Sequence, residues 1–204
     1  MTQSDDVRDR LAEAVLRLAG ERGWQSLTLG DIAEAASLAV GELPAAFRSK
    51  TSVLVACAER VESQAAAEPV EFDEGDTVRD RLFELLMQRL DLLAPHKAGV
   101  GAILRDLPRD PVAGLIAAPQ MTRLMAPILR GAGVGTSGPT GLLRCKGLAA
   151  VWWRTLSVWT EDDSPDHAKT MAALDQALRR IEPAGQALAR VDACVMPRAA
   201  PGGL

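Results

Sequence analysis

The most constraining feature of the sequence is the stretch of residues 27–53, LTLGDIAEAASLAVGELPAAFRSKTSV, which predicts three short helices in quick succession. Thr28 suits the N-cap of the first helix and Ser49 that of the third. A tight turn at Ser37 leads into a second helical piece that carries Phe47. Two short helices joined by such a turn are typical of a helix-turn-helix. The stretch therefore predicts a compact helical headpiece.

The rest of the chain also repeats apolar residues at helical spacing, and Tyr is absent from a sequence with only 3% aromatic residues. This pattern favours helices over sheets, so we expect an all-α fold of about nine or ten helices. An acidic segment at 68–75 separates a headpiece (1–67) from a larger C-terminal domain (68–204). The predicted helices cover residues 5–20, 49–67, 77–93, a short stretch to 107, 111–129, 142–160, 165–181 and 184–195.

Prolines and glycines set several of these limits. Pro119 should break or kink its helix, and Pro183 should end the helix that Ser164 and Pro165 begin. The glycine-rich segment 131–141 lacks the Gly-Lys-Ser/Thr register of a phosphate loop and predicts a flexible connection between helices. The tail at 197–204 is expected to be disordered.

The charge distribution gives no support for an extended nucleic-acid surface. The chain has a net charge of −4, and residues 1–60 contain seven basic and nine acidic residues. A basic excess would have favoured nucleic-acid binding. Any DNA contact must therefore come from a few local cations.

Catalytic and metal-binding patterns are also missing. The two His residues have no Cys or carboxylate at ligand spacing, and the acidic run 161–163 suits a solvated turn. Cys57, Cys145 and Cys194 lie far apart, as expected for reduced thiols. We find no leader sequence and no apolar run of about 18 residues. The sequence predicts a cytoplasmic protein that is not an enzyme and uses neither cofactor nor metal.

The helix-turn-helix stretch resembles the signature of the TetR family of bacterial regulators, which runs close to AGVSxGTLYxHFxSKExL. The register fits without a gap, and matches fall at Ala36, Gly41, Leu43, Phe47, Ser49 and Lys50. The resemblance implies a TetR-like fold, with a three-helix headpiece and a helical ligand-binding and dimerisation domain. It also implies a dimeric transcriptional regulator, a repressor, that binds operator DNA and an apolar small molecule.

The departures from this signature fall where DNA contact is expected. The family's capping Ser is Ala39, its Thr is Glu42 and its Tyr is Pro44, with alanines at the next two positions. Pro44 should also delay the second helix and leave a stub of about one turn. The predicted DNA-facing residues, with this weakened contact set, are Thr28, Gly41, Glu42, Arg48 and Lys50.

A second resemblance concerns residues 159–178 and 78–97, which are similar to segments of TetR-fold lipid-binding accessory proteins of coenzyme Q (ubiquinone) biosynthesis. This resemblance implies an alternative function, in which a degenerate headpiece does not read DNA. Members of that family carry an amphipathic helix that docks on membranes, and residues 184–195 occupy the corresponding place. The two functions stay open at this point.

The TetR resemblance also implies where ligand and partner subunit bind. The last two long helices would pair with their copies across a two-fold axis. The residues expected in this dimer interface, or in the core just under it, are Trp152, Trp153, Leu156, Leu174 and Leu178. The pocket would lie between the helices at 77–93, 111–129 and 142–160, and its expected lining is Leu86, Leu90, Met121, Met125 and Trp153.

Overall fold

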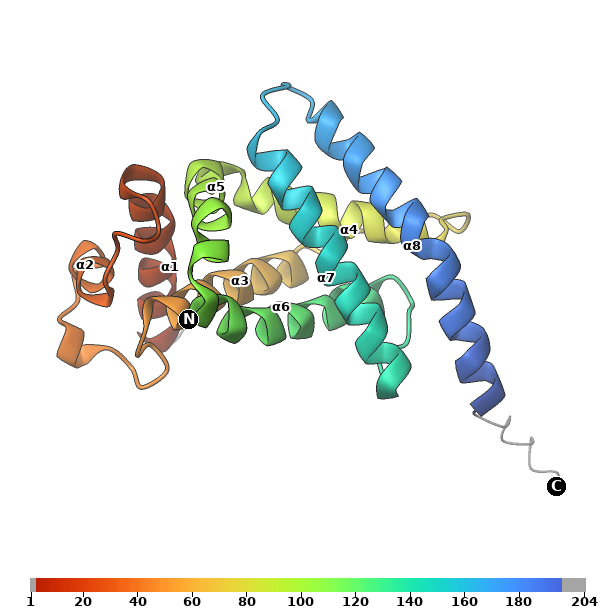
Figure 1. Cartoon of the computed structure of the whole chain (residues 1–204), viewed down its shortest axis with the longest axis horizontal. Coiled ribbons are helices and arrows are strands. Elements are labelled where there is room, and N and C mark those ends of the chain that lie inside the picture. Colours follow the sequence, from red (N-terminus) through yellow and green to blue (C-terminus); the bar gives the residue numbers. More distant parts are fainter. Residues whose placement is uncertain (1–2, 196–204) are drawn as a thin grey trace.

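The computed structural model describes residues 3–195, without the side chains of residues 3–5, Glu42 and Val195, and this range is all-α as predicted (Figure 1). The headpiece contains α1 (Gln3–Arg22), α2 (Leu29–Ala35), the 3-10 turn η1 (Val40–Glu42) and α3 (Lys50–Ala67). The following elements are α4 (Val78–Leu93), η2 (Ala94–His96), α5 (Lys97–Asp106), η3 (Leu107–Arg109), α6 (Pro111–Gly131), α7 (Gly138–Thr160) and α8 (Ala168–Val195). The predicted tail at 197–204 lies outside the described residues.

One hydrophobic core joins the headpiece to the rest of the molecule. The packing between α1 and α5 is so close that a Cβ added at Gly99 would lie 2.0 Å from the carbonyl oxygen of Leu16. Only glycine allows this approach of two helix backbones. The predicted acidic segment is non-helical, but Val70 and Phe72 pack against the core. The division at residues 67 and 68 stays a prediction.

Capping boxes begin three of the predicted helices. The hydroxyl of Thr28 accepts a hydrogen bond from the Asp31 amide. In the same way, the hydroxyl of Ser49 accepts from the Ser52 amide, and that of Thr77 accepts from the Asp80 amide. In each box the later side chain bonds back to the N-cap backbone. These reciprocal bonds satisfy amides that have no partner inside a helix.

The helix end predicted at Pro183 was wrong, and Pro119 does not break its helix. Helix α6 continues through Pro119 and Pro127, and α8 continues through Pro183 as one helix to Val195. Each proline removes one backbone hydrogen bond, and the helix continues on the bonds of the flanking turns. Helix α7 also begins earlier than predicted, at Gly138, within the glycine-rich segment.

The turn before α8 is organised by Asp162 rather than by the predicted cap at Ser164. The Asp162 carboxylate accepts hydrogen bonds from the Ser164 amide at 3.0 Å and from the Thr170 amide and hydroxyl at 2.8 and 2.7 Å. The Ser164 hydroxyl also donates to it, so this side chain is not free to cap α8. These donors hold the pKa of Asp162 well below its ordinary value. Helix α8 therefore starts at Ala168.

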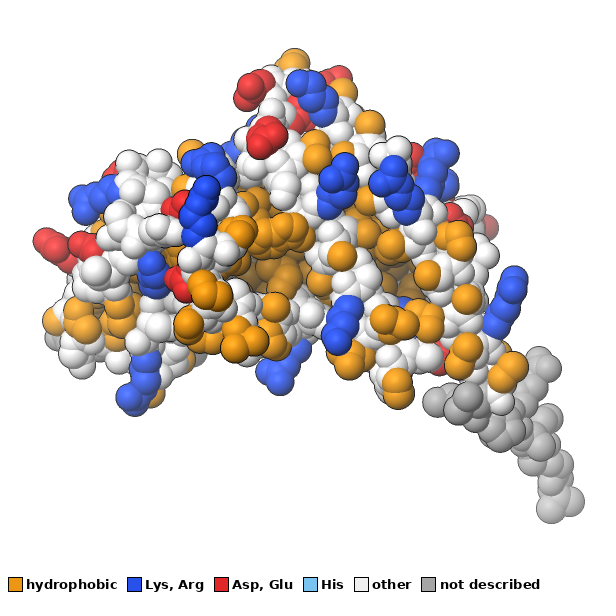
Figure 2. All heavy atoms as spheres, viewed as in Figure 1, with side chains coloured by type: hydrophobic (Ala, Val, Ile, Leu, Met, Phe, Trp, Pro, Cys, Tyr) orange, Lys and Arg blue, Asp and Glu red, His pale blue; other side chains and the backbone are white. Residues whose placement is uncertain are grey.

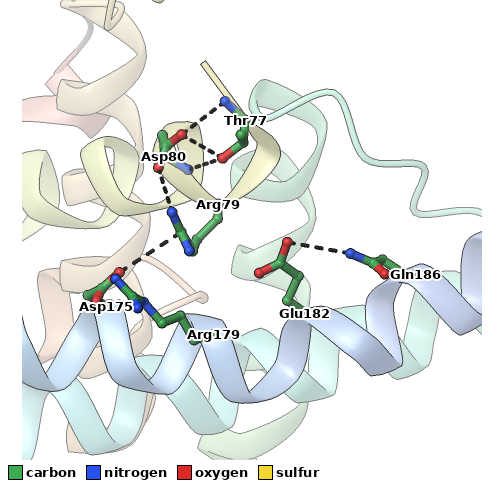
Figure 3. Close-up of polar contacts among 7 residues, drawn as sticks. All are labelled: Thr77, Arg79, Asp80, Asp175, Arg179, Glu182 and Gln186. Atoms are coloured by element: carbon green, nitrogen blue, oxygen red, sulfur yellow. Dashed lines mark hydrogen bonds and ion pairs between the residues drawn. The ribbon is translucent and has the colours of Figure 1, made fainter. Parts of the chain in front are cut away.

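An ion-pair chain links the start of α4 to α8 (Figure 3). The Arg79 guanidinium lies 3.5 Å from Asp80 and 3.9 Å from Asp175, and Arg179 binds Asp175 from the next turn at 2.9 Å. All of these groups are partly exposed, so each pair contributes little to stability. These pairs mark a place where α4 and α8 lie side by side.

Helix α6 differs from the expectation that no segment suits a membrane span. By length and composition alone it is apolar enough to cross one. Its second half packs Met125, Ile128 and Leu129 in the core, whereas Leu115 near its start is 78% exposed. A core helix meets the same criteria, so the composition of α6 indicates no more than its apolar character.

Candidate functional site

The second half of the helix-turn-helix is not an α-helix. It consists of the 3-10 turn η1 and a further turn in which the Phe47 amide donates to the Pro44 carbonyl at 2.8 Å. An α-helix from Val40 would need an amide at position 44, which proline lacks. The Leu43 amide therefore bonds the Val40 carbonyl in the shorter 3-10 pattern, at 3.3 Å. The predicted late α-helical stub was wrong.

Packing holds this segment, residues 38–48, in place, and we call it the tip of the headpiece. Phe47 is buried in the core, and Leu38 and Leu43 pack partly against it. Its outer surface includes apolar side chains: Val40 is 53% exposed, and Ala45 and Ala46 are exposed beside Arg48. The tip thus keeps the anchoring residues of the motif without its second helix.

Basic side chains near the tip are tied into the headpiece itself. The Lys50 ammonium donates to the Trp24 carbonyl at 3.0 Å and lies 4.8 Å from the centre of the Trp24 ring. Arg10 donates to the Ser37 carbonyl at 3.0 Å and also to that of Ala36. Arg48 donates to the Ala45 carbonyl at 3.1 Å. A phosphate would have to compete with these internal acceptors.

The other predicted DNA-facing residues have different surroundings. The Thr28 hydroxyl is engaged with Asp31 in the capping box of α2. Gly41 is exposed at the tip, and a Cβ added there would meet no atom within 4 Å. The side chain of Glu42 lies outside the described residues, although its backbone belongs to η1. The DNA-contact roles of these residues stay predictions.

An apolar cavity of about 440 Å³ lies between the headpiece and the C-terminal helices. Figure 2 shows its hollow, lined by hydrophobic side chains, between α5 and α6 on one side and α7 on the other. Three predicted lining residues, Met121, Met125 and Trp153, line it. Leu86 and Leu90 of α4 do not line it and are buried in the protein core instead.

Helix α3 forms a wall of this cavity that sequence reasoning missed. Residues Leu54, Cys57 and Val61 of α3 line it, together with Leu16 of α1. Burial raises the pKa of the Cys57 thiol to about 12, so this thiol stays protonated. The cavity therefore borders the same helix that starts directly after the tip.

Two charged residues at the cavity, Glu62 of α3 and Arg89 of α4, were also missed. They form a two-pronged ion pair with nitrogen–oxygen distances of 2.7 and 2.8 Å. No local sequence signal identifies this pair, because its members are 27 residues apart. Glu62 and Arg89 are the only charged residues among the described residues that line the cavity, and the ion pair holds them side by side.

Four of the five residues predicted for the dimer interface, or for the core just under it, are buried within one chain, and the fifth, Trp153, is 37% exposed. Trp152 and Leu156 on α7 are buried and line the cavity, and Leu174 and Leu178 on α8 are buried in the core. These four side chains hold α7 against its neighbours within one subunit. Their predicted place in a dimer, in the interface or in the core just under it, stays a prediction.

Comparisons with known proteins agree with this arrangement. Residues 11–57 match the model of the family described as bacterial regulatory proteins, tetR family. No curated protein sequence matches the chain at a significant level.

Solved structures of TetR transcriptional regulators superpose on most of the chain. One from Nitrosomonas europaea ATCC 19718 shares 22% identity and a TM-score of 0.62, covering 85% of this chain and 96% of that protein. One from Rhodococcus sp. RHA1 shares 18% identity and has a TM-score of 0.60, and the match covers 89% of this chain and 98% of that protein. A tetR-family regulator from Streptomyces coelicolor shares 19% identity and has a TM-score of 0.54, and the match covers 97% of this chain and 92% of that protein.

At these identities the superpositions establish the fold, and the family match establishes the kind of headpiece. Residues 11–57 thus match the tetR-family model, and the chain as a whole shares its fold with solved structures of TetR transcriptional regulators.

Proposed function

We propose that this protein is a dimeric, ligand-responsive transcriptional regulator that holds DNA mainly through the phosphate backbone and reads bases weakly. The observation that carries the proposal is the apolar cavity beside a TetR-family headpiece. A hollow of this size and lining suits a small apolar molecule. The repressor role follows from the family resemblance.

Helix α3 provides the proposed connection between ligand and DNA. Its N-cap, Ser49, directly follows the tip, and its middle part contributes Leu54 and Val61 to the lining of the cavity. A ligand that changes the packing of α3 against α4 would move the tip relative to its copy in a dimer. Both headpieces must fit successive turns of DNA, so such a movement lowers affinity.

We place the dimer contact on the outward faces of α7 and α8. On α7, Leu143 and Ala150 are exposed and share one face with Gly147. On α8, Ala187 and Val191 are exposed at one-turn spacing. Small and apolar residues allow two helix pairs to approach closely and bury surface.

The proposal is tested by gel shifts of the purified protein with its own upstream DNA region, at low and moderate salt. A regulator shifts this fragment as a dimer, and apolar ligands release it. The dimer is measured separately by light scattering during size-exclusion chromatography. A monomer, or a shift that no apolar molecule affects, would argue against the proposal.

A second candidate is a lipid-binding accessory protein whose headpiece does not bind DNA. The missing second helix and the internally bound Lys50 favour it. In this case residues 184–195 could touch a membrane, although Asp192 binds Arg144 at 2.6 Å and so ties the segment to α7. Solvent extraction of the purified protein followed by mass spectrometry separates the two candidates. A bound isoprenoid lipid without any DNA shift favours the second.

A further inference from the structure

We infer that the cavity selects an uncharged apolar molecule with one hydroxyl or carbonyl group, which lies against the Glu62–Arg89 ion pair. The inference rests on the proposed ligand-binding role and deepens it by naming the chemical class of ligand. It follows from the geometry of the pair and from the charge balance of the cavity wall.

The ion pair is well formed and nearly buried. Arg89 Nε donates to Glu62 Oε1 at 2.7 Å, and Arg89 Nη2 donates to Glu62 Oε2 at 2.8 Å. Arg89 Nη1 donates to the Leu85 carbonyl at 2.6 Å, which fixes the guanidinium on α4. The side chains of Arg89 and Glu62 are only 7% and 16% exposed. The pair is therefore a fixed part of the wall.

The wall of the cavity is electrically balanced. Among the described lining residues, Glu62 and Arg89 carry the only charges, and these are opposite. The other polar groups among the lining residues are uncharged: the side chains of Gln120 and Thr122, the Cys57 thiol and the indole N–H groups of Trp152 and Trp153. The Thr122 hydroxyl already donates to the Ala118 carbonyl at 2.9 Å. No side chain is left to neutralise an incoming charge.

A charged ligand would disturb this balance. A carboxylate that paired fully with Arg89 would displace Glu62 and leave the Glu62 charge unpaired in apolar surroundings. A carboxylate that accepted only the second Nη2 hydrogen would place its charge beside the Glu62 carboxylate, with no further cation in the described lining to balance it. An ammonium group meets the same two alternatives, with the roles of Glu62 and Arg89 exchanged. An unpaired charge in an apolar cavity is strongly unfavourable, so each of these arrangements costs affinity.

An uncharged polar group needs no such exchange. Each carboxylate oxygen of Glu62 has a further lone pair and can accept a hydroxyl hydrogen while Arg89 stays bound. Arg89 Nη2 has a second hydrogen that a carbonyl oxygen can accept. The rest of the ligand then fills a lining in which the flexible Met121 and Met125 adapt to its shape.

The test compares three ligands with one alkyl chain and different head groups: decanol, decanoate and decylammonium. Each is titrated into the full-length protein at neutral pH, below the concentration at which it forms micelles. Binding is followed by calorimetry and by tryptophan fluorescence, since Trp152 and Trp153 line the cavity. We expect decanol to bind at least roughly tenfold more tightly than either charged ligand.

The variant Glu62→Gln makes the test specific to the ion pair. It leaves the Arg89 charge without a countercharge, so the preference should shift from decanol to decanoate. The matched control is Glu59→Gln, which removes a carboxylate from the exposed side of the same helix and should not alter the order.

If Glu62→Gln does not fold, the double variant Glu62→Leu/Arg89→Met replaces both charges by apolar groups, an exchange that buried pairs often tolerate. Its cavity should bind decanol roughly tenfold more weakly, because the polar anchor is lost.

Two results overturn the inference alone. One is a wild-type protein that binds decanoate as tightly as decanol. The other is a decanol affinity that neither the Glu62→Gln nor the double variant changes. Failure of all three ligands to bind overturns the ligand-binding role as well, so the two failures can be told apart.

Discussion

The two halves of the helix-turn-helix show how differently one motif can be maintained. Helix α2 has its capping box and its buried residues, Ile32 and Ala33. The tip has kept buried Phe47 but has a 3-10 turn where the second helix is expected. Packing residues therefore hold the shape of a headpiece even where the second helix of the motif is absent.

The largest effect is expected for Phe47→Ala, which removes the anchor of the tip. A buried phenylalanine truncated to alanine destabilises a protein by about 3–5 kcal/mol. Urea unfolding measures the change in the free energy of unfolding. The control Ala46→Ser alters the exposed surface of the tip and should change it by less than about 0.5 kcal/mol. Equal effects would mean that the tip is not held by packing.

The second effect concerns Asp162, which organises another turn that replaces a predicted helix start. Its folded-state pKa is lowered, so the ionised form stabilises the fold above the ordinary aspartate pKa of about 3.9. That stabilisation is lost as the pH falls through and below this value. Asp162→Asn should lower the melting temperature at neutral pH, and the difference from wild type should shrink in acid. A difference that stays constant with pH would contradict the assigned role.

A smaller effect is expected for Thr28→Ala, which removes the N-cap of α2. Loss of a capping hydroxyl costs about 1 kcal/mol. Ser49→Ala removes the equivalent cap of α3 and provides a matched comparison in the same unfolding experiment. If Thr28→Ala leaves stability unchanged, packing alone maintains α2 as it does the tip.

The smallest change in stability is expected for Pro44→Ala, which restores the missing amide at the tip. We expect helical circular dichroism to increase by about one turn of helix, with a stability change below about 1 kcal/mol. Pro119→Ala is the control, because Pro119 already lies within a helix and its replacement adds no helical residues. An unchanged spectrum for Pro44→Ala would show that other residues prevent the second helix.

Local signals in the sequence predicted most of the fold. Thr28, Ser49 and Thr77 mark helix starts because their partners lie only three residues away. The helix end predicted at Pro183 was wrong because the loss of one backbone hydrogen bond does not stop α8, and α6 likewise continues through Pro119.

The candidate site was only partly predictable, since its parts meet across long sequence separations. The methionines of α6 were found at the cavity, but the wall formed by α3 and the Glu62–Arg89 pair was not. Lys50 matched the family signature, yet the structure binds it to Trp24, which lies 26 residues earlier. Such contacts depend on how helices pack, and no local pattern encodes them.

The central claim is that the tip keeps the shape of a DNA-binding motif but reads bases weakly. The most direct test is fluorescence anisotropy of the protein with its own upstream DNA and with a scrambled fragment of equal length, at one fixed salt concentration. We predict that the two affinities differ by roughly tenfold or less, because phosphate contacts dominate. A preference for the upstream fragment well above this ratio would contradict the claim.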